Sequence, residues 1–186
     1  SEVIMEKLFK RGVAEVLPSK ETLSSLMKKR KIRIYLGVDP TSPNLHLGHA
    51  VALRKLRQFQ DLGHEVVLLF GTFTAQIGDP SGRDTMRQPL GAKEIAANMA
   101  TYKKQAGLIL NNSKTVYKEN GAWLGKLKLN EILSIASHLT VSRLLERDMF
   151  QERLKQGREI WLHEFLYPLL QGYDSVAMDV DAELGG

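Results

Sequence analysis

The sequence predicts an α/β protein built around a parallel sheet, and three neighbouring segments lead to this prediction. Residues 32–37 alternate apolar with polar or small side chains, which is the period of a half-buried strand. Residues 65–71 read E-V-V-L-L-F-G, a continuous apolar run that is typical of a strand buried on both faces. A helical pattern over residues 48–62 lies between them and ends at Gly63. Strand, helix and buried strand together predict a βαβ unit with parallel strands.

The other expected elements follow from apolar spacing and from capping residues. They are helices over 2–11 and after Ser19, a long helix over 92–110, a strand near 114–117, a turn at Asn120-Gly121, and short helices over 131–138, 141–147 and 149–155, the first two capped by Asn130 and Thr140. Residues 160–174 are predicted to be helical, with a kink at Pro168. The short, capped helices give residues 110–158 the character of a helical insertion.

The composition is that of an ordinary globular protein and sets limits on function. The chain has 186 residues, of which 43% are hydrophobic and 25% charged, enough for one well-buried domain. It has no cysteine, which excludes disulfides and thiolate metal sites. We expect no membrane association and a cytoplasmic location, because no segment has the pattern of a membrane span or a signal peptide. The formal net charge of +5 favours a polyanionic partner.

The segment Tyr35–His49, Y-L-G-V-D-P-T-S-P-N-L-H-L-G-H, leads from the first strand through a proline-rich turn into a helix. A helix N-terminus offers unpaired N–H groups and a partial positive charge to an anion. His46 and His49 could donate hydrogen bonds to phosphate oxygens, and Gly48 leaves room for the flat ring of a ligand. The same histidines could instead be helix caps or surface residues, because H-x-G-H alone is a weak motif.

The connection after the second strand, residues 71–90, contains Q-I-G-D-P-S-G-R and shows no clear regular structure. Long connections of this kind are usually functional when they are ordered. Ligands of parallel sheets bind beyond the carboxyl ends of the strands, so this connection and residues 39–49 are expected at the same edge. Asp79 is either a turn residue or a carboxylate for a substrate ammonium group. Arg83 and Arg87 could reach a phosphate.

The segment 160–174, I-W-L-H-E-F-L-Y-P-L-L-Q-G-Y-D, places polar groups within an apolar helix. Tyr167, Gln171 and Asp174 are spaced i, i+4 and i+7, so they share one face of a continuous helix. Such a face is either the solvated side of the helix or a specificity pocket with hydrogen-bonding groups in an apolar wall. We favour the pocket. The aromatic residues Trp123, Phe150 and Trp161 are predicted to be packing or interface anchors.

These three segments, in this order, resemble those of bacterial-type tyrosyl-tRNA synthetases, which are class I aminoacyl-tRNA synthetases. Tyr35–His49 resembles the first strand and HIGH signature of the family, and G-D-P-S-G-R and H-E-F-L-Y-P-L-L-Q-G-Y-D-S-V-A resemble its amino-acid pocket segments. The resemblance implies the first half of a Rossmann-like parallel sheet of the class I (HUP) type, with a helical connective insertion. It implies N-terminal helices over 1–31, a βαβ half over 32–110, the insertion over 111–158, and the pocket helix with a following strand over 159–186.

The resemblance also implies which residues bind the amino acid. Tyr35 and Asp174 would bind the phenol hydroxyl of tyrosine. A site built for that hydroxyl rejects phenylalanine strongly, because its own polar groups would remain unpaired. Asp79, Tyr167 and Gln171 would hold the ammonium group.

The implied nucleotide contacts lie on the first two segments. Gly37 and Asp39 would line the adenylate side, Gly48 would lie against the ribose and adenine, and Arg83 and Arg87 would belong to the ATP site. Arg83 occupies a position at which many relatives have lysine, so the charge is kept while the geometry differs. ATP enters with Mg²⁺, and the sequence indicates no protein metal site.

Catalysis is assigned by the resemblance to Thr41, His46 and His49. Thr41 and His46 would bind the departing pyrophosphate, and His49 would lie near the ribose. The implied reaction joins L-tyrosine to ATP as tyrosyl-adenylate and then transfers tyrosine to tRNA(Tyr). The connective insertion would form a homodimer interface and help to hold tRNA.

Three other functions remain as alternatives: another H-x-G-H nucleotidyltransferase, a tryptophan-type synthetase, and a non-catalytic RNA-binding module with the same fold. Tyr35 with Asp174 suits a hydroxyl group better than an indole N–H. The resemblance further implies that the second half of the fold, the KMSKS loop and the anticodon-binding domain are absent from these 186 residues. We therefore expect the isolated segment to have at most weak tyrosine binding and little adenylation activity.

Overall fold

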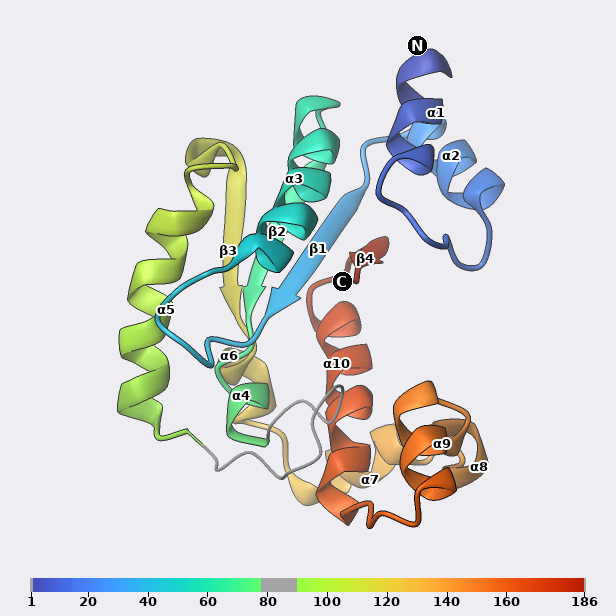
Figure 1. Ribbon diagram of the computed structural model, residues 1–186, viewed down its shortest axis with the longest axis vertical. Coiled ribbons are helices and arrows are strands. Elements are labelled where there is room, and N and C mark those ends of the chain that lie inside the picture. The colour runs from blue at the N-terminus through green and yellow to red at the C-terminus, as the bar shows by residue number, and fades with distance from the viewer. Residues whose placement is uncertain (1, 78–89, 186) are drawn as a thin grey trace.

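The computed structural model describes residues 2–77 and 90–185. In chain order its elements are α1 (Glu2–Lys10), α2 (Lys20–Lys29), β1 (Arg33–Val38), α3 (Leu47–Asp61), β2 (Glu65–Phe70), α4 (Thr74–Ile77), α5 (Ala92–Ala106), the 3₁₀ turn η1 (Asn112–Lys114), β3 (Thr115–Glu119), α6 (Gly121–Leu124), α7 (Leu129–Ala136), α8 (Val141–Leu145), α9 (Asp148–Lys155), the 3₁₀ turn η2 (Leu162–Phe165), α10 (Leu166–Ala177) and β4 (Ala182–Leu184). Figure 1 shows their arrangement.

The sheet has four parallel strands in the order β3-β2-β1-β4. Arg33 of β1 pairs with Glu65 of β2, and Ile34 pairs with Ala182 of β4. This confirms the predicted parallel βαβ unit and the Rossmann-like α/β class. The arrowheads of β1, β2 and β3 point toward the end of the molecule that carries α4, α6 and the start of α10, whereas α1 and α2 lie at the opposite end (Figure 1).

The alternation of side chains along β1 divides the core into two layers. Ile34, Leu36 and Val38 are buried in the larger layer, in which helices α3 and α5 also bury apolar side chains. Tyr35 belongs to the smaller layer, which contains Met178 just beyond α10. Helices therefore cover both faces of the sheet, and Tyr35 is directed to the face that α10 covers.

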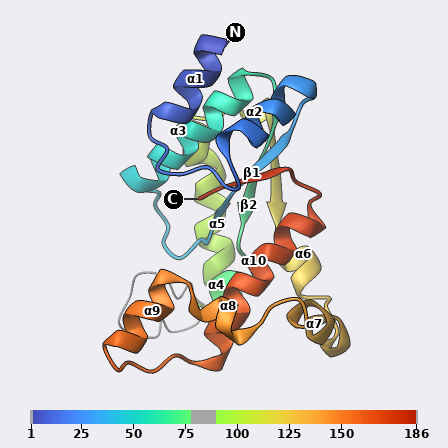
Figure 2. The same ribbon diagram turned by 90° about the vertical axis from the view of Figure 1, so that its right-hand side faces the viewer.

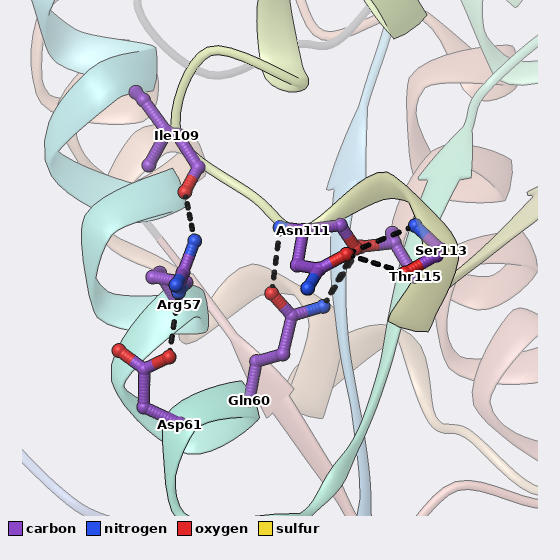
Figure 3. A network of polar contacts seen from close by, with 7 residues as sticks. All are labelled: Arg57, Gln60, Asp61, Ile109, Asn111, Ser113 and Thr115. Carbon is purple, nitrogen blue, oxygen red and sulfur yellow. Dashed lines mark hydrogen bonds and ion pairs between the residues drawn. The ribbon is translucent and has the colours of Figure 1, made fainter.

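A polar network fixes the carboxyl-terminal part of α3 to the connection between α5 and β3 (Figure 3). The amide of Gln60 accepts a hydrogen bond from Asn111 N–H (2.8 Å) and donates to Asn111 O (3.2 Å) and Thr115 Oγ1 (2.9 Å). Arg57 donates to Ile109 O at 3.0 Å. Gln60 is buried, so these bonds satisfy polar groups that would otherwise be costly inside the protein. The network sets where β3 begins.

Helix ends agree with the predictions where a capping side chain is local. Ser19 accepts from Thr22 N–H, Thr140 accepts from Arg143 N–H, and Gly63 has the positive φ (86°) that ends a helix. The predicted cap Asn130 is wrong. The helix α7 begins earlier, because the carboxylate of Glu131 accepts a hydrogen bond from Lys128 N–H at 2.7 Å.

Two other predictions of local structure are corrected. Pro168 lies in the first turn of α10, directly after η2, rather than at a kink within a continuous helix. A first-turn residue needs no N–H for the helix, so proline is tolerated there. The connection after β2 is not wholly irregular, because it includes α4 (Thr74–Ile77).

Helices α7, α8 and α9 all lie beyond the carboxyl ends of the strands in both views, with α8 next to α9 and α7 against α10 (Figures 1 and 2). Phe150 of α9 is fully buried and packs against Phe165, with ring centroids 4.8 Å apart, as predicted for a packing anchor. Trp161, in contrast, is 49% exposed and is not part of the core. These helices and η2 lead the chain into α10.

Candidate functional site

A cavity of about 370 Å³ lies at the carboxyl end of β1 and is lined by residues of the sheet and of α10. Its walls come from segments far apart in the sequence, namely β1, the connection after β2, α10 and β4. The predicted site residues that line it are Tyr35, Gly37, Asp39, Tyr167, Gln171 and Asp174. The i, i+4, i+7 spacing thus did predict three side chains that share one pocket.

Asp174 is a buried carboxylate, 2% exposed, that is held by two neutral donors. Oδ1 accepts from the indole Nε1–H of Trp123 at 2.7 Å, and Oδ2 accepts from Nδ2 of Asn120 at 3.1 Å. Burial raises the pKa of Asp174 to about 6, and these two hydrogen bonds oppose the rise because they stabilise the charged form. Trp123, predicted to be a packing or interface anchor, therefore also holds a polar group of the cavity.

Asn120 was predicted only as part of a turn, yet it is 1% exposed and connects three segments. Its Nδ2 donates to Thr74 Oγ1 (3.1 Å) as well as to Asp174, and its Oδ1 accepts from Phe73 N–H (2.9 Å). The residue thus joins the end of β3 to the connection after β2 and to α10. The Asn-Gly pattern gave no sign of this role, because its partners lie far away in the sequence.

Tyr35 is 1% exposed, and its hydroxyl accepts a hydrogen bond from Ser175 Oγ at 3.1 Å. Burial raises the pKa of Tyr35, and the negative charges of Glu183 and Asp174 add to the rise. The phenol is therefore neutral at physiological pH and is both a donor and an acceptor. Tyr35 and Asp174 line the same cavity, while each is held in place by its own protein partners.

Asp39 follows β1 and connects the turn to the other wall of the cavity. Its Oδ1 accepts from Thr74 Oγ1 (2.7 Å) and its Oδ2 accepts from the hydroxyl of Tyr167 (2.9 Å). A side chain at Gly71 would overlap with Asp39 Oδ1 and Thr74 Oγ1, so only glycine fits there. Tyr167 is thus aligned by Asp39, and its predicted contact with an ammonium group stays a prediction.

His46 and His49 cap the start of α3 reciprocally. His46 Nδ1 accepts from Gly48 N–H (3.1 Å), His49 Nδ1 accepts from His46 N–H (3.2 Å), and the ring centroids are 4.0 Å apart. Because both Nδ1 atoms act as acceptors, each neutral ring carries its proton on Nε2. The pKa of His49 is lowered by burial and by His46. The cap interpretation is therefore confirmed. Each ring keeps an Nε2–H donor, and the predicted hydrogen bonds to phosphate oxygens stay a prediction.

The structure gives a reason for glycine at position 48 that the sequence did not indicate. A Cβ atom at this position would lie 3.0 Å from the ring of His46, so a larger residue would disturb the cap. Gly48, Thr41 and the two histidines lie outside the described lining of the cavity, at the start of α3 and in the turn before it. The predicted residues Asp79, Arg83 and Arg87 lie outside the described residues.

Within residues 2–77 and 90–185, no group of three or more His, Asp or Glu side chains is arranged to hold a metal ion. Over the same residues, no helix is both long and apolar enough to cross a membrane.

The comparisons with known proteins agree with one another. A family model described as tRNA synthetases class I (W and Y) matches residues 27–186. A tyrosine--tRNA ligase of Francisella tularensis is 52% identical over 180 residues, which are 97% of this chain and 46% of that protein. The tyrosine--tRNA ligase of Thermotoga maritima is likewise 52% identical over 180 residues, covering 97% of this chain and 45% of that protein.

Solved structures show the same fold. A C-terminally truncated mitochondrial tyrosyl-tRNA synthetase of Coccidioides posadasii matches with a TM-score of 0.81 at 28% identity, over 97% of this chain and 53% of that one. The corresponding protein of Aspergillus nidulans matches with a TM-score of 0.82 at 28% identity, over 94% and 53%. The chain belongs to the class I tRNA synthetase family that comprises the tryptophan and tyrosine enzymes. It spans somewhat less than half the length of the curated relatives that it matches.

Proposed function

We propose that this chain is the N-terminal part of the catalytic domain of a tyrosine--tRNA ligase. The enzyme would activate L-tyrosine with ATP and transfer it to tRNA(Tyr). The observation that carries the proposal is the buried carboxylate of Asp174, held by Trp123 and Asn120 in the same cavity as the buried hydroxyl of Tyr35. Membership of the family and the 52% identity to tyrosine--tRNA ligases support it.

Tyrosine would place its phenol hydroxyl between Tyr35 and Asp174. Asp174 accepts from the substrate hydroxyl when it is charged, and the neutral Tyr35 can either donate or accept. Phenylalanine has no hydroxyl, so Tyr35 and Asp174 would each lack this hydrogen-bond partner inside the cavity. Each buried polar group left unsatisfied costs about 1–3 kcal/mol of binding free energy. Tyr167 and Gln171, together with Asp79, would hold the ammonium group.

The nucleotide would lie along the turn after β1 and the start of α3. Gly37, which is exposed, and Asp39 would flank the adenylate, with Gly48, Arg83 and Arg87 in the remaining ATP contacts. The carboxylate of tyrosine attacks the α-phosphorus, a P–O bond forms, and the bond to pyrophosphate breaks. Thr41 and the Nε2–H groups of His46 and His49 would donate to the phosphate oxygens as their charge grows. Catalysis then rests on positioning and on preorganised donors.

Mg²⁺ would arrive bound to the phosphates of ATP and so form part of the substrate.

Besides its substrates, the chain would bind another copy of itself. Leu129, Leu133, Leu139 and Val141 expose 71%, 63%, 39% and 65% of their surface on the helical insertion, and apolar side chains gathered on a surface favour association. We propose a homodimer through this region. A cytoplasmic location remains a prediction from the sequence.

The proposal is tested by the thermal stability of the chain with millimolar L-tyrosine, L-phenylalanine, L-tryptophan and ATP. A ligand that binds only the folded state raises the melting temperature by mass action. We expect tyrosine to raise it clearly more than phenylalanine or tryptophan does. Equal shifts with all three amino acids would contradict the proposal, and a larger shift with tryptophan would favour the tryptophan-type enzyme of the same family.

A further inference from the structure

Glu183 of β4 lines the amino-acid cavity, although no sequence pattern pointed to it. It is the direct neighbour of Tyr35 in the parallel pairing of β4 with β1. Paired residues of adjacent strands direct their side chains to the same face of a sheet, so Glu183 lies on the face that α10 covers. Its side chain is exposed, so both solvent and a ligand can reach it.

Oε1 of Glu183 accepts a hydrogen bond from Nε2 of the Gln171 side-chain amide at 2.5 Å. A glutamine amide is planar, with a donor NH₂ group on one side and an acceptor oxygen on the other. When Nε2 is directed to Glu183, the acceptor Oε1 is turned away from β4. A hydrogen bond to a carboxylate is stronger than one to a neutral acceptor, so the charge of Glu183 favours this orientation.

The cavity also has an excess of negative charge. Its charged lining residues, among those that the structure describes, are Asp39, Asp174, Glu183 and Arg147, which gives three carboxyl groups and one guanidinium. An acidic cavity favours a ligand that carries a positive charge. The amino group of an amino acid, which is protonated at neutral pH, is such a charge.

We infer that Glu183 is a positioning residue of the amino-acid cavity: it holds the amide of Gln171 so that Oε1 accepts from the ammonium group of the substrate. The inference rests on the proposed function, in which Gln171 binds that group. Glu183 itself acts through Gln171 and through its charge. It therefore contributes to selection for ligands that carry an amino group, whereas the phenol hydroxyl would be bound by Tyr35 and Asp174.

The test compares the affinities of two ligands that differ only in the amino group. These are L-tyrosine and its desamino analogue 3-(4-hydroxyphenyl)propanoate, titrated calorimetrically into the chain and its variants. Glu183→Ala removes both the acceptor and the charge, and should weaken L-tyrosine about tenfold while changing the analogue less than about threefold. Glu183→Gln keeps an acceptor for Gln171 without the charge, so its effect should be intermediate. The control Glu15→Gln removes one exposed charge from a residue that does not line the cavity, and should change neither affinity.

A second measurement needs no ligand. In nitrogen-15 spectra, the side-chain NH₂ signals of Gln171 should be shifted away from those of solvent-exposed glutamines, and they should move to the exposed values in Glu183→Ala. Signals at exposed values in the unaltered chain would overturn the inference, as would equal losses for both ligands. If L-tyrosine does not bind the unaltered chain, the proposed function fails and the ammonium role fails with it. Shifted amide signals would then still show that Glu183 orients Gln171.

Discussion

The two ends of the sheet hold their charged residues in different ways. At the amino end, Arg33 forms an ion pair with Glu65 at 2.6 Å, and Arg30 pairs with Asp181. The Arg33 and Glu65 side chains are 38% and 44% exposed. At the carboxyl end, the carboxylate of Asp174 is 2% exposed and is bound by an indole and an amide.

The difference shows how a fold can keep a charge available. An ion pair cancels the charge of both partners and leaves little to offer a ligand. Neutral donors hold a carboxylate in place while its negative charge remains, at the cost of its desolvation. The charges at the amino end are thus neutralised by ion pairs, whereas the carboxylate of Asp174 at the carboxyl end keeps a negative charge that can interact with a ligand.

The largest expected effect tests the charge of Asp174 directly. Asp174→Asn replaces the carboxylate with an amide, which has one acceptor oxygen and one NH₂ donor, so either Trp123 or Asn120 loses its acceptor. We expect the preference for L-tyrosine over L-phenylalanine to fall by roughly 100-fold or more, measured as the ratio of the two dissociation constants. Tyr35→Phe should reduce the same ratio without removing a charge. An unchanged ratio in both variants would break the comparison, because the carboxyl end would then not serve the phenol hydroxyl.

The pH dependence of stability should have opposite signs at the two ends. The pKa of Asp174 is raised from 3.8 to about 6 by burial, so its contribution to the free energy of unfolding is largest below pH 3.8 and is lost as the pH rises to about 6. The hydrogen bond from Arg30 lowers the pKa of Asp181 below 3.8, so its contribution is present above pH 3.8 and is lost on acidification. Urea denaturation at a series of pH values measures both.

Two asparagine variants separate these contributions. Asp174→Asn should flatten the decline of stability between about pH 4 and pH 6, whatever its effect on the stability at neutral pH. Asp181→Asn should reduce the loss of stability below pH 4. If the two variants changed the pH profile in the same direction, the contrast between a compensated and an uncompensated carboxylate would be wrong.

The smallest effect is expected at the exposed ion pair. Glu65→Gln removes the charge that faces Arg33 and should lower the free energy of unfolding by less than about 1 kcal/mol, because exposed pairs contribute little. Urea denaturation measures this change, and L-tyrosine binding should be unaltered. A loss of several kcal/mol would mean that the amino end depends on its ion pairs far more than their exposure implies.

The sequence predicted the fold well where the signal was local. The alternation in β1, the apolar run of β2 and the caps Ser19 and Thr140 are all short-range patterns, and each is confirmed. Asn130 was a wrong cap because a neighbouring carboxylate, Glu131, occupies the competing position. Local rules list the candidates for a cap, and the surrounding side chains select among them.

The site was predictable to the extent that one helix face defines it. Tyr167, Gln171 and Asp174 could be grouped from their spacing, and all three line the cavity. Asn120 and Trp123 were not assigned to it, because their partner Asp174 lies 54 and 51 residues away. Such contacts leave no periodic trace, so an Asn-Gly turn and an isolated tryptophan gave no indication of the buried carboxylate that they share.

The return of β4 to β1 has a consequence for the order of folding. Asp181, just before β4, binds the backbone of Arg33 across a sequence separation of 148 residues. Closing so long a loop is entropically costly and slow, whereas β1, α3 and β2 are joined by short connections and can assemble early. During synthesis from the N-terminus, this βαβ unit can therefore form before α10 and β4 have left the ribosome. Because Glu183 and Leu184 of β4 line the cavity, this cavity can form only after β4 has paired with β1, and a ligand that needs all of its walls can bind only after that step.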